Sequence, residues 1–202
     1  TNLDFEAKKV LRDRFNIIHF HMTNVTALKL MANAIKIKEP VRDEWETKLV
    51  TLWDNVESCA REIIQYSEGI KIEELKRLLP IHPFSAYLLY ILSRQLSSNQ
   101  RTMFKFLKEE VSNEDENVKH NFNWFIQNHS IDGWRWLTAD IMWDYFFKSS
   151  DEDLPEDIIS LINYYHTHCK KLNDNELKLF KCALLLIAMN RQLGAQELLR
   201  PL

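Results

Sequence analysis

The sequence predicts an all-α protein built as a multi-helix bundle, and two observations support this prediction. The 202-residue chain contains only three glycines and five prolines, too few for the many tight turns of an all-β protein. Hydrophobic residues make up 46% of the chain, and they recur at the three- and four-residue spacing of amphipathic helices. We therefore expect a packed helical core.

The one strand candidate is the aromatic and β-branched stretch FNIIHFHM at residues 15–22. A lone strand leaves its backbone hydrogen-bonding groups unpaired, so most of its sheet would have to come from outside this chain. Residues 4–14 before it are charged and compatible with a helix. Eight further helices are expected after it, at 25–35, 40–68, 72–79, 84–96, 101–110, 139–146, 155–171 and 174–193.

Local signals set several helix boundaries. Thr23 or Asn24 can cap the first of these eight helices. Pro40 opens the longest one, whose apolar residues recur at steps of four and three, and Gly69 ends it. The stretch NDNE at 173–176 has the spacing of a capping box and opens the last helix.

The polar stretch SNEDENVKHN at 112–121 predicts a surface loop that separates two parts of the chain. The first part, 1–111, contains the helix 84–96, which is apolar nearly all round and is expected at its centre. The second part, 122–202, is expected to be a second helical subdomain that leads towards a C-terminal region missing from this sequence. Residue 1 is Thr rather than Met, which fits a piece of a longer protein.

Composition and charge narrow the class of protein. A net charge of −3 does not indicate a nucleic-acid-binding surface. The longest apolar run, 182–189, is too short to cross a bilayer, so no membrane partner is expected. The three cysteines are odd in number and lack CxxC spacing, which favours reduced thiols and a cytoplasmic location.

No catalytic or metal-binding constellation is visible. A Walker A loop, a GxGxxG loop and a GxSxG elbow are all absent from the sequence. The chain is therefore not expected to hold nucleotide phosphates in a backbone nest of its own. His19 with His21, and His166 with Cys169, share a face in pairs, but a zinc site needs three or four ligands.

Tryptophans gather in a short aromatic-dense segment that contains Trp134, Trp136 and Trp143. Large aromatic side chains fill cores, and they also form the centres of protein interfaces. Both interpretations stay open from the sequence. The three residues are the candidates for a partner surface.

Arg101 follows the polar turn SSNQ and starts the predicted helix 101–110. The first turn of a helix already carries partial positive charge, so an arginine there is favoured mainly when an anion approaches from outside. A guanidinium group recognises phosphate well because it is planar and permanently charged. The ordinary alternative is a solvated surface charge.

Several stretches, taken in order, resemble ATPase families. VLRDRFNIIHFHMTNVTALKLMANAI (10–35) is similar to the segment of AAA+ ATPases that leaves the last core strand and enters the helical lid. LPIHPFSAYLLYILSRQLSSNQRTMFKFL (79–107) and WLTADIMWDYF (136–146) resemble stretches of large bacterial P-loop ATPases of phage-exclusion (BREX) and related defence systems. LFKCALLLIAMN (179–190) and ELLRPL (197–202) lie where that family runs towards a winged-helix region.

The resemblance implies a helical lid and adaptor region of a defence-type ATPase, without its nucleotide-binding core and inactive alone. Arg101 would be the arginine that senses the γ-phosphate, and Arg14 or Arg12 the arginine given to a neighbouring subunit. ATP and Mg would be cofactors of the full-length protein only. Its partners would be the rest of its own chain, other subunits of an oligomer and, for the whole assembly, nucleic acid. The alternative hypothesis is a stand-alone all-α interaction module that uses the tryptophan-rich segment.

Overall fold

The computed structural model describes residues 22–65, 69–95, 99–110, 120–130, 132, 136–147 and 154–189, without the side chains of 95 and 99–102. Within these ranges the fold is all-α, as the sequence predicts. The only β-type contact among them is an isolated bridge between Ile81 and Leu137. Of the strand candidate 15–22, only Met22 falls inside the description, and the Tyr90 hydroxyl donates a hydrogen bond of 3.3 Å to its carbonyl.

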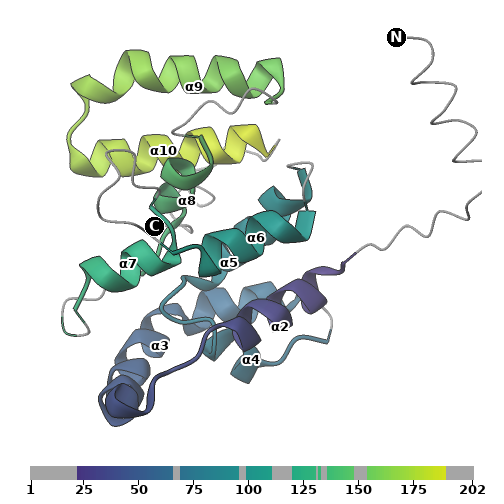
Figure 1. Cartoon of the computed structure of the whole chain (residues 1–202), viewed down its shortest axis with the longest axis vertical. Helices are drawn as coiled ribbons and strands as arrows, with labels where there is room; N and C mark the ends of the chain where they lie inside the picture. The colour runs from purple at the N-terminus through teal and green to yellow at the C-terminus, as the bar shows by residue number, and fades with distance from the viewer. Residues whose placement is uncertain are drawn as a thin grey trace, which may run out of the picture.

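The elements up to residue 108 surround one central helix, α5, which contacts α2, α3 and α6. Their bounds are α2 (Asn24–Ala34), the 3-10 helix η1 (Glu39–Val41), α3 (Arg42–Gln65), α4 (Ile72–Lys76), α5 (Pro83–Gln95) and α6 (Asn99–Lys108). Figure 1 shows α5 and α6 in the middle of the molecule, with α2, α3 and α4 below them. The central position predicted for 84–96 is confirmed, because Leu88 and Leu89 on α5 are fully buried.

The remaining elements comprise α7, which lies at about the height of α5 in Figure 1, and the elements that form the upper part of the molecule in that view. They are α7 (Phe122–Asn128), α8 (Ala139–Phe147), α9 (Glu156–His168), the 3-10 helix η2 (Cys169–Lys171) and α10 (Asp174–Ala188). α10 packs against both α8 and α9, and α8 also touches α5. The division of the chain at 111–122 stays a prediction, because 111–119 lie outside the described residues.

The predicted caps are largely where the sequence places them. The Thr23 hydroxyl accepts the Thr26 N–H at 3.2 Å and caps α2. The Asn173 side chain accepts the Glu176 N–H at 3.0 Å, and the Glu176 carboxylate accepts the Asn173 N–H at 2.9 Å, which completes the capping box of α10. Gly69 has a φ of +88°, a left-handed conformation that glycine adopts without steric cost.

Several details of the helix predictions change; for example, α4 ends at Lys76 and not at the predicted residue 79. Pro40 lies in η1, so the longest helix opens with a 3-10 turn and α3 proper begins at Arg42. The short helix α7 was not predicted, because 122–128 offer too few residues for a repeating apolar pattern. Its N-cap is Asn121, whose side chain accepts the Trp124 N–H at 2.9 Å, and Phe125 anchors the helix in the core.

Backbone hydrogen bonds join the two groups of helices at the isolated bridge. Leu137 N–H donates to Pro80 O at 2.9 Å, and His82 N–H donates to Leu137 O at 3.1 Å. Ile81 and Leu137 are both fully buried there. The turn between α4 and α5 is thereby fixed to the segment that leads into α8.

Candidate functional site

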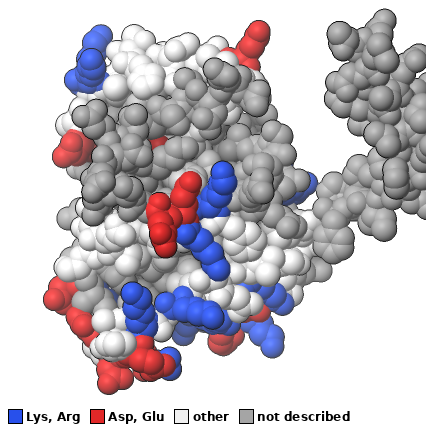
Figure 2. Space-filling model, viewed as in Figure 1, with Lys and Arg blue, Asp and Glu red and all other residues white. Residues whose placement is uncertain are grey.

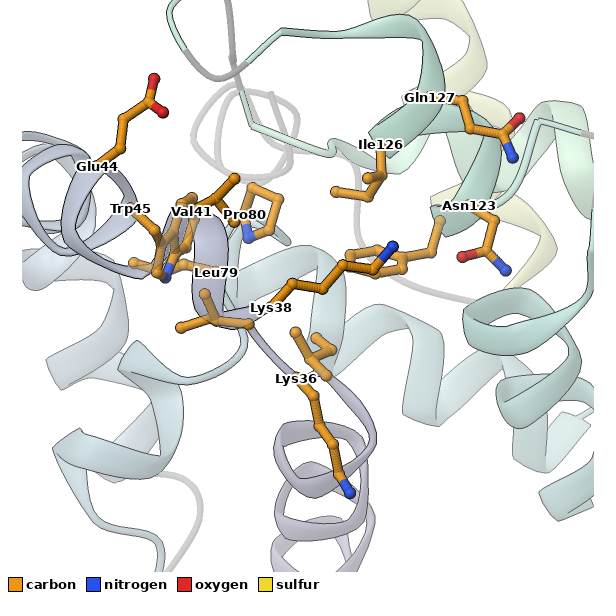
Figure 3. A pocket seen from close by; sticks show the side chains of 13 residues that line it. Lys36, Lys38, Val41, Glu44, Trp45, Leu79, Pro80, Asn123, Ile126 and Gln127 are labelled. Atoms are coloured by element: carbon orange, nitrogen blue, oxygen red, sulfur yellow. The ribbon is translucent and has the colours of Figure 1, made fainter.

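A groove of about 580 Å³ opens between four segments of the chain: the linker 35–38, η1 with the start of α3, the turn before α5, and α7. This volume falls within the range of known binding sites. The apolar wall of the groove includes Ile35, Val41, Trp45, Leu79, Pro80 and Ile126. Figure 3 shows Val41, Trp45 and Pro80 on one side of the groove and Ile126 on the other.

The wall combines a buried floor with an exposed rim. Trp45 and Leu79 belong to the hydrophobic core, at 5% and 2% exposure. Ile37 and Val41 are each 42% exposed although both line the groove. Exposed aliphatic side chains that gather around one groove are typical of a binding surface.

Cationic side chains border the same groove. Lys36 and Lys38 are exposed, and among the described residues neither forms an ion pair. The neighbouring Glu39 carboxylate pairs with the Arg42 guanidinium at 2.5 Å and not with Lys38. In Figure 3 the Lys38 side chain extends across the groove in the direction of Asn123, whereas the Glu44 carboxylate points away from its centre.

The surface around α2 and α4 carries further positive charge. Figure 2 shows Lys and Arg side chains spread over the lower part of the molecule, where these helices lie in Figure 1. Two of these cations are engaged: Lys29 pairs with Glu74 at 3.5 Å, and Arg77 donates to the Asn33 side chain at 2.9 Å. Lys36 and Lys38 beside the groove form no such pair within the described part of the chain, so both are available to an external anion.

Helix α6 connects the predicted arginine site to the upper helices. Arg101 is the third residue of α6, so its backbone lies in the first turn, as the sequence predicts. At the other end, the Glu109 carbonyl accepts hydrogen bonds from the Asn121 and Asn123 side chains at 2.7 and 2.9 Å. The Tyr145 hydroxyl on α8 donates to the Glu109 carboxylate at 2.5 Å.

Burial and this hydrogen bond both raise the pKa of Tyr145. Both effects favour the protonated phenol, the form that donates the hydrogen bond to Glu109. Phe106 on α6 adds an edge-to-face contact with the Tyr145 ring, with centroids 5.1 Å apart. The C-terminal end of α6 is thus firmly attached to both α7 and α8.

Of the other predicted site residues, Trp136 and Trp143 belong to the part of the chain that the structure describes. Arg12, Arg14 and Trp134 lie outside the described residues. Trp136 is half-buried, and its ring meets the His82 ring edge-to-face with centroids 6.0 Å apart. Trp143 has no exposed surface and packs against Phe147. The proposal of Trp143 as a partner-surface residue is therefore corrected: its indole fills the core between α8 and its neighbours.

A charged cluster that the sequence did not suggest joins α8 and α10. Asp144 is only 8% exposed, and its carboxylate accepts a hydrogen bond of 2.7 Å from the Lys181 amine. The His120 ring lies 3.4 Å from the same carboxylate oxygen. Burial raises the pKa of Asp144, but the hydrogen bonds from His120 and Lys181 outweigh it and leave the pKa below its ordinary value. With both neighbours bound, this carboxylate serves as a structural anchor.

Sequence reasoning missed the groove because its walls come from segments that are up to about ninety residues apart. One local signal was available. The linker IKIK alternates apolar and cationic residues at 35–38, and nothing in a helical pattern accounts for that alternation.

Other site classes receive no support from the described part of the chain. In the ranges given above, no group of three or more His, Cys, Asp or Glu residues is placed to hold a metal ion. No disulfide bond joins Cys59, Cys169 and Cys182. None of the described helices combines the length and apolar character needed to cross a membrane.

Comparison with known proteins identifies no relative. No protein-family model matches the sequence, and neither the curated proteins nor the solved structures contain a match.

Proposed function

We propose that this chain is a helical lid and adaptor region of a larger, cytoplasmic P-loop ATPase of the phage-defence type, which transmits nucleotide state to a helical bundle. The observation that carries the proposal is the course of α6. Its first turn holds Arg101, and the residue after its last turn, Glu109, is clamped to α7 and α8.

The mechanism follows from the stiffness of that helix. A γ-phosphate bound by Arg101 would pull on the N-terminal end of α6, and the helix would carry this displacement about 12 Å to Glu109 and its partners. Tyr145 and the two asparagine side chains would then move with it. The position of Arg101 in the first turn of α6 and the contacts of Glu109 beyond its last turn support such coupling.

The test uses the full-length protein. The coding sequence upstream of residue 1 should contain G-x-x-x-x-G-K-[ST], and the complete protein should hydrolyse ATP with Mg. Arg101→Ala should lower that rate about tenfold or more, because it removes a cation from the terminal phosphate. Lys105→Ala is the matched control, since Lys105 is an exposed cation on the same helix.

Two results would contradict the proposal. One is a complete protein without a P-loop. The other is an ATP hydrolysis rate that Arg101→Ala leaves equal to that of Lys105→Ala.

A further inference from the structure

We infer that the groove beside the linker 35–38 binds an acidic, amphipathic segment of a partner polypeptide. Apolar side chains of that segment would fill the groove, and its carboxylates would contact Lys36 and Lys38. This inference is independent of the ATPase proposal, because it uses neither Arg101 nor a nucleotide.

The apolar wall of the groove is shaped to receive a side chain of the partner segment. Trp45 and Leu79 form a floor that the core holds in place, while Ile37 and Val41 stand at the rim. Because this floor is already ordered, binding an apolar side chain on it costs little conformational entropy of the receptor. Binding energy at protein interfaces concentrates in such pockets. Covering the exposed rim as well removes additional apolar surface from water.

The linker 35–38 supplies the positive charge beside the groove. Its backbone is extended at both ends, with φ and ψ of −86° and 122° at Ile35 and of −72° and 138° at Lys38. Apolar and cationic residues alternate along these four positions of the chain, and Figure 3 shows the Lys38 side chain across the groove and the Lys36 side chain directed away from it. A segment that alternates apolar and acidic residues has the complementary pattern.

The positions of the lysines favour a polypeptide over a small molecule. In Figure 3, Lys38 extends across the groove, but Lys36 points away from it. An occupant that meets both amines must therefore continue beyond the groove. A polypeptide does so, and each apolar residue that it places in the groove can be followed by an acidic residue outside.

The binding test uses fluorescence anisotropy of a fluorescein-labelled, acetylated peptide, Asp-Leu-Glu-Phe-Asp-Leu-Glu, titrated with the 202-residue chain. Saturable binding is expected. It should weaken about tenfold or more when the acids of the peptide are replaced by Asn and Gln, and equally when its Leu and Phe are replaced by Ser. Added salt should weaken the binding of the acidic peptide but not that of the Asn and Gln peptide.

Two variants locate the site, each with a matched control. Lys38→Glu should abolish binding, whereas Lys170→Glu, at an exposed lysine of η2, should leave it unchanged. Val41→Trp should obstruct the groove, whereas Val50→Trp should not, because Val50 is 63% exposed on α3 and does not line it. All four positions are exposed, so the helical circular dichroism of each variant should match that of the unmodified chain.

Three outcomes would overturn the inference. The first is no saturable binding of the acidic peptide. The second is binding that Lys38→Glu and Val41→Trp leave intact. The third is binding of the small anion 1-anilinonaphthalene-8-sulfonate at the groove without binding of the peptide, which would indicate a small-molecule site.

Discussion

The buried environment of His82 predicts a pH dependence of stability. Its side chain is 7% exposed at the junction between the two groups of helices. Its Nδ1 accepts the Phe84 N–H at 3.3 Å, which requires that nitrogen to be unprotonated. Burial lowers the pKa of His82 from 6.5 to about 4. The folded protein therefore holds this ring neutral over a range in which the unfolded chain binds a proton.

This difference predicts a loss of stability in mild acid. Between the unfolded pKa of 6.5 and the folded pKa of about 4, the unfolded state binds the extra proton, so the free energy of unfolding falls as the pH falls. From pH 7 to pH 5 the loss should be about 2 kcal/mol. Urea denaturation at the two pH values measures it.

Matched variants assign the effect to His82. His82→Gln should remove most of the pH dependence in this range. His166→Gln should preserve it, because His166 is exposed on α9. An unchanged pH dependence in His82→Gln would show that other groups cause the loss.

Residue-level predictions from the sequence were limited by long-range contacts. The sequence cannot show that Asp144 meets Lys181, because the two residues lie on different helices and no local spacing links them. For the same reason it left open whether the tryptophans form a core or a surface, and Trp143 proves to be core. Arg101 was placed in a first turn correctly, since that depends only on the local signal SSNQ.

At the scale of single elements, the capping box of α10 offers the cleanest prediction. Asn173→Ala removes the side-chain acceptor for the N–H groups of Asn175 and Glu176. It should lower the free energy of unfolding by about 1 kcal/mol. Asn175→Ala, an exposed position in the same first turn, is the control and should change stability by less than about 0.5 kcal/mol. Equal effects of the two substitutions in urea denaturation would contradict a capping role.

Helices that have a repeating apolar pattern were predicted from the sequence, whereas α7, which lacks one, was not. α2, α5 and α10 each have a repeating apolar pattern, and each begins within one residue of its predicted start, whereas α10 ends at Ala188 and not at the predicted residue 193. α7 depends instead on tertiary contacts: Asn121 and Asn123 donate to the Glu109 carbonyl, which belongs to the end of another helix. A seven-residue helix is too short to be stable from its own sequence.

For the whole molecule, composition was enough to predict the fold class but not the junction between its parts. Few glycines and recurring apolar residues already exclude most β architectures. The bridge between Ile81 and Leu137 joins positions 56 residues apart in the sequence, and no local pattern encodes such a pairing. The groove depends on the same junction, because Leu79 and Pro80 form part of its wall.

This junction predicts that the two groups of helices unfold together. Leu137 is fully buried, and its backbone forms hydrogen bonds with the backbones of Pro80 and His82. In addition, α8 contacts α5. Leu137→Ala should therefore lower the opening free energy of α5 and of α8 by a similar amount, about 2–5 kcal/mol. Hydrogen exchange of peptides that cover each helix measures the two values separately.

Leu179→Ala, at a side chain 37% exposed on α10, serves as the control and should affect both helices little. If Leu137→Ala accelerates exchange in α8 while α5 keeps its protection, the two groups are independent folding units and the bridge does not couple them.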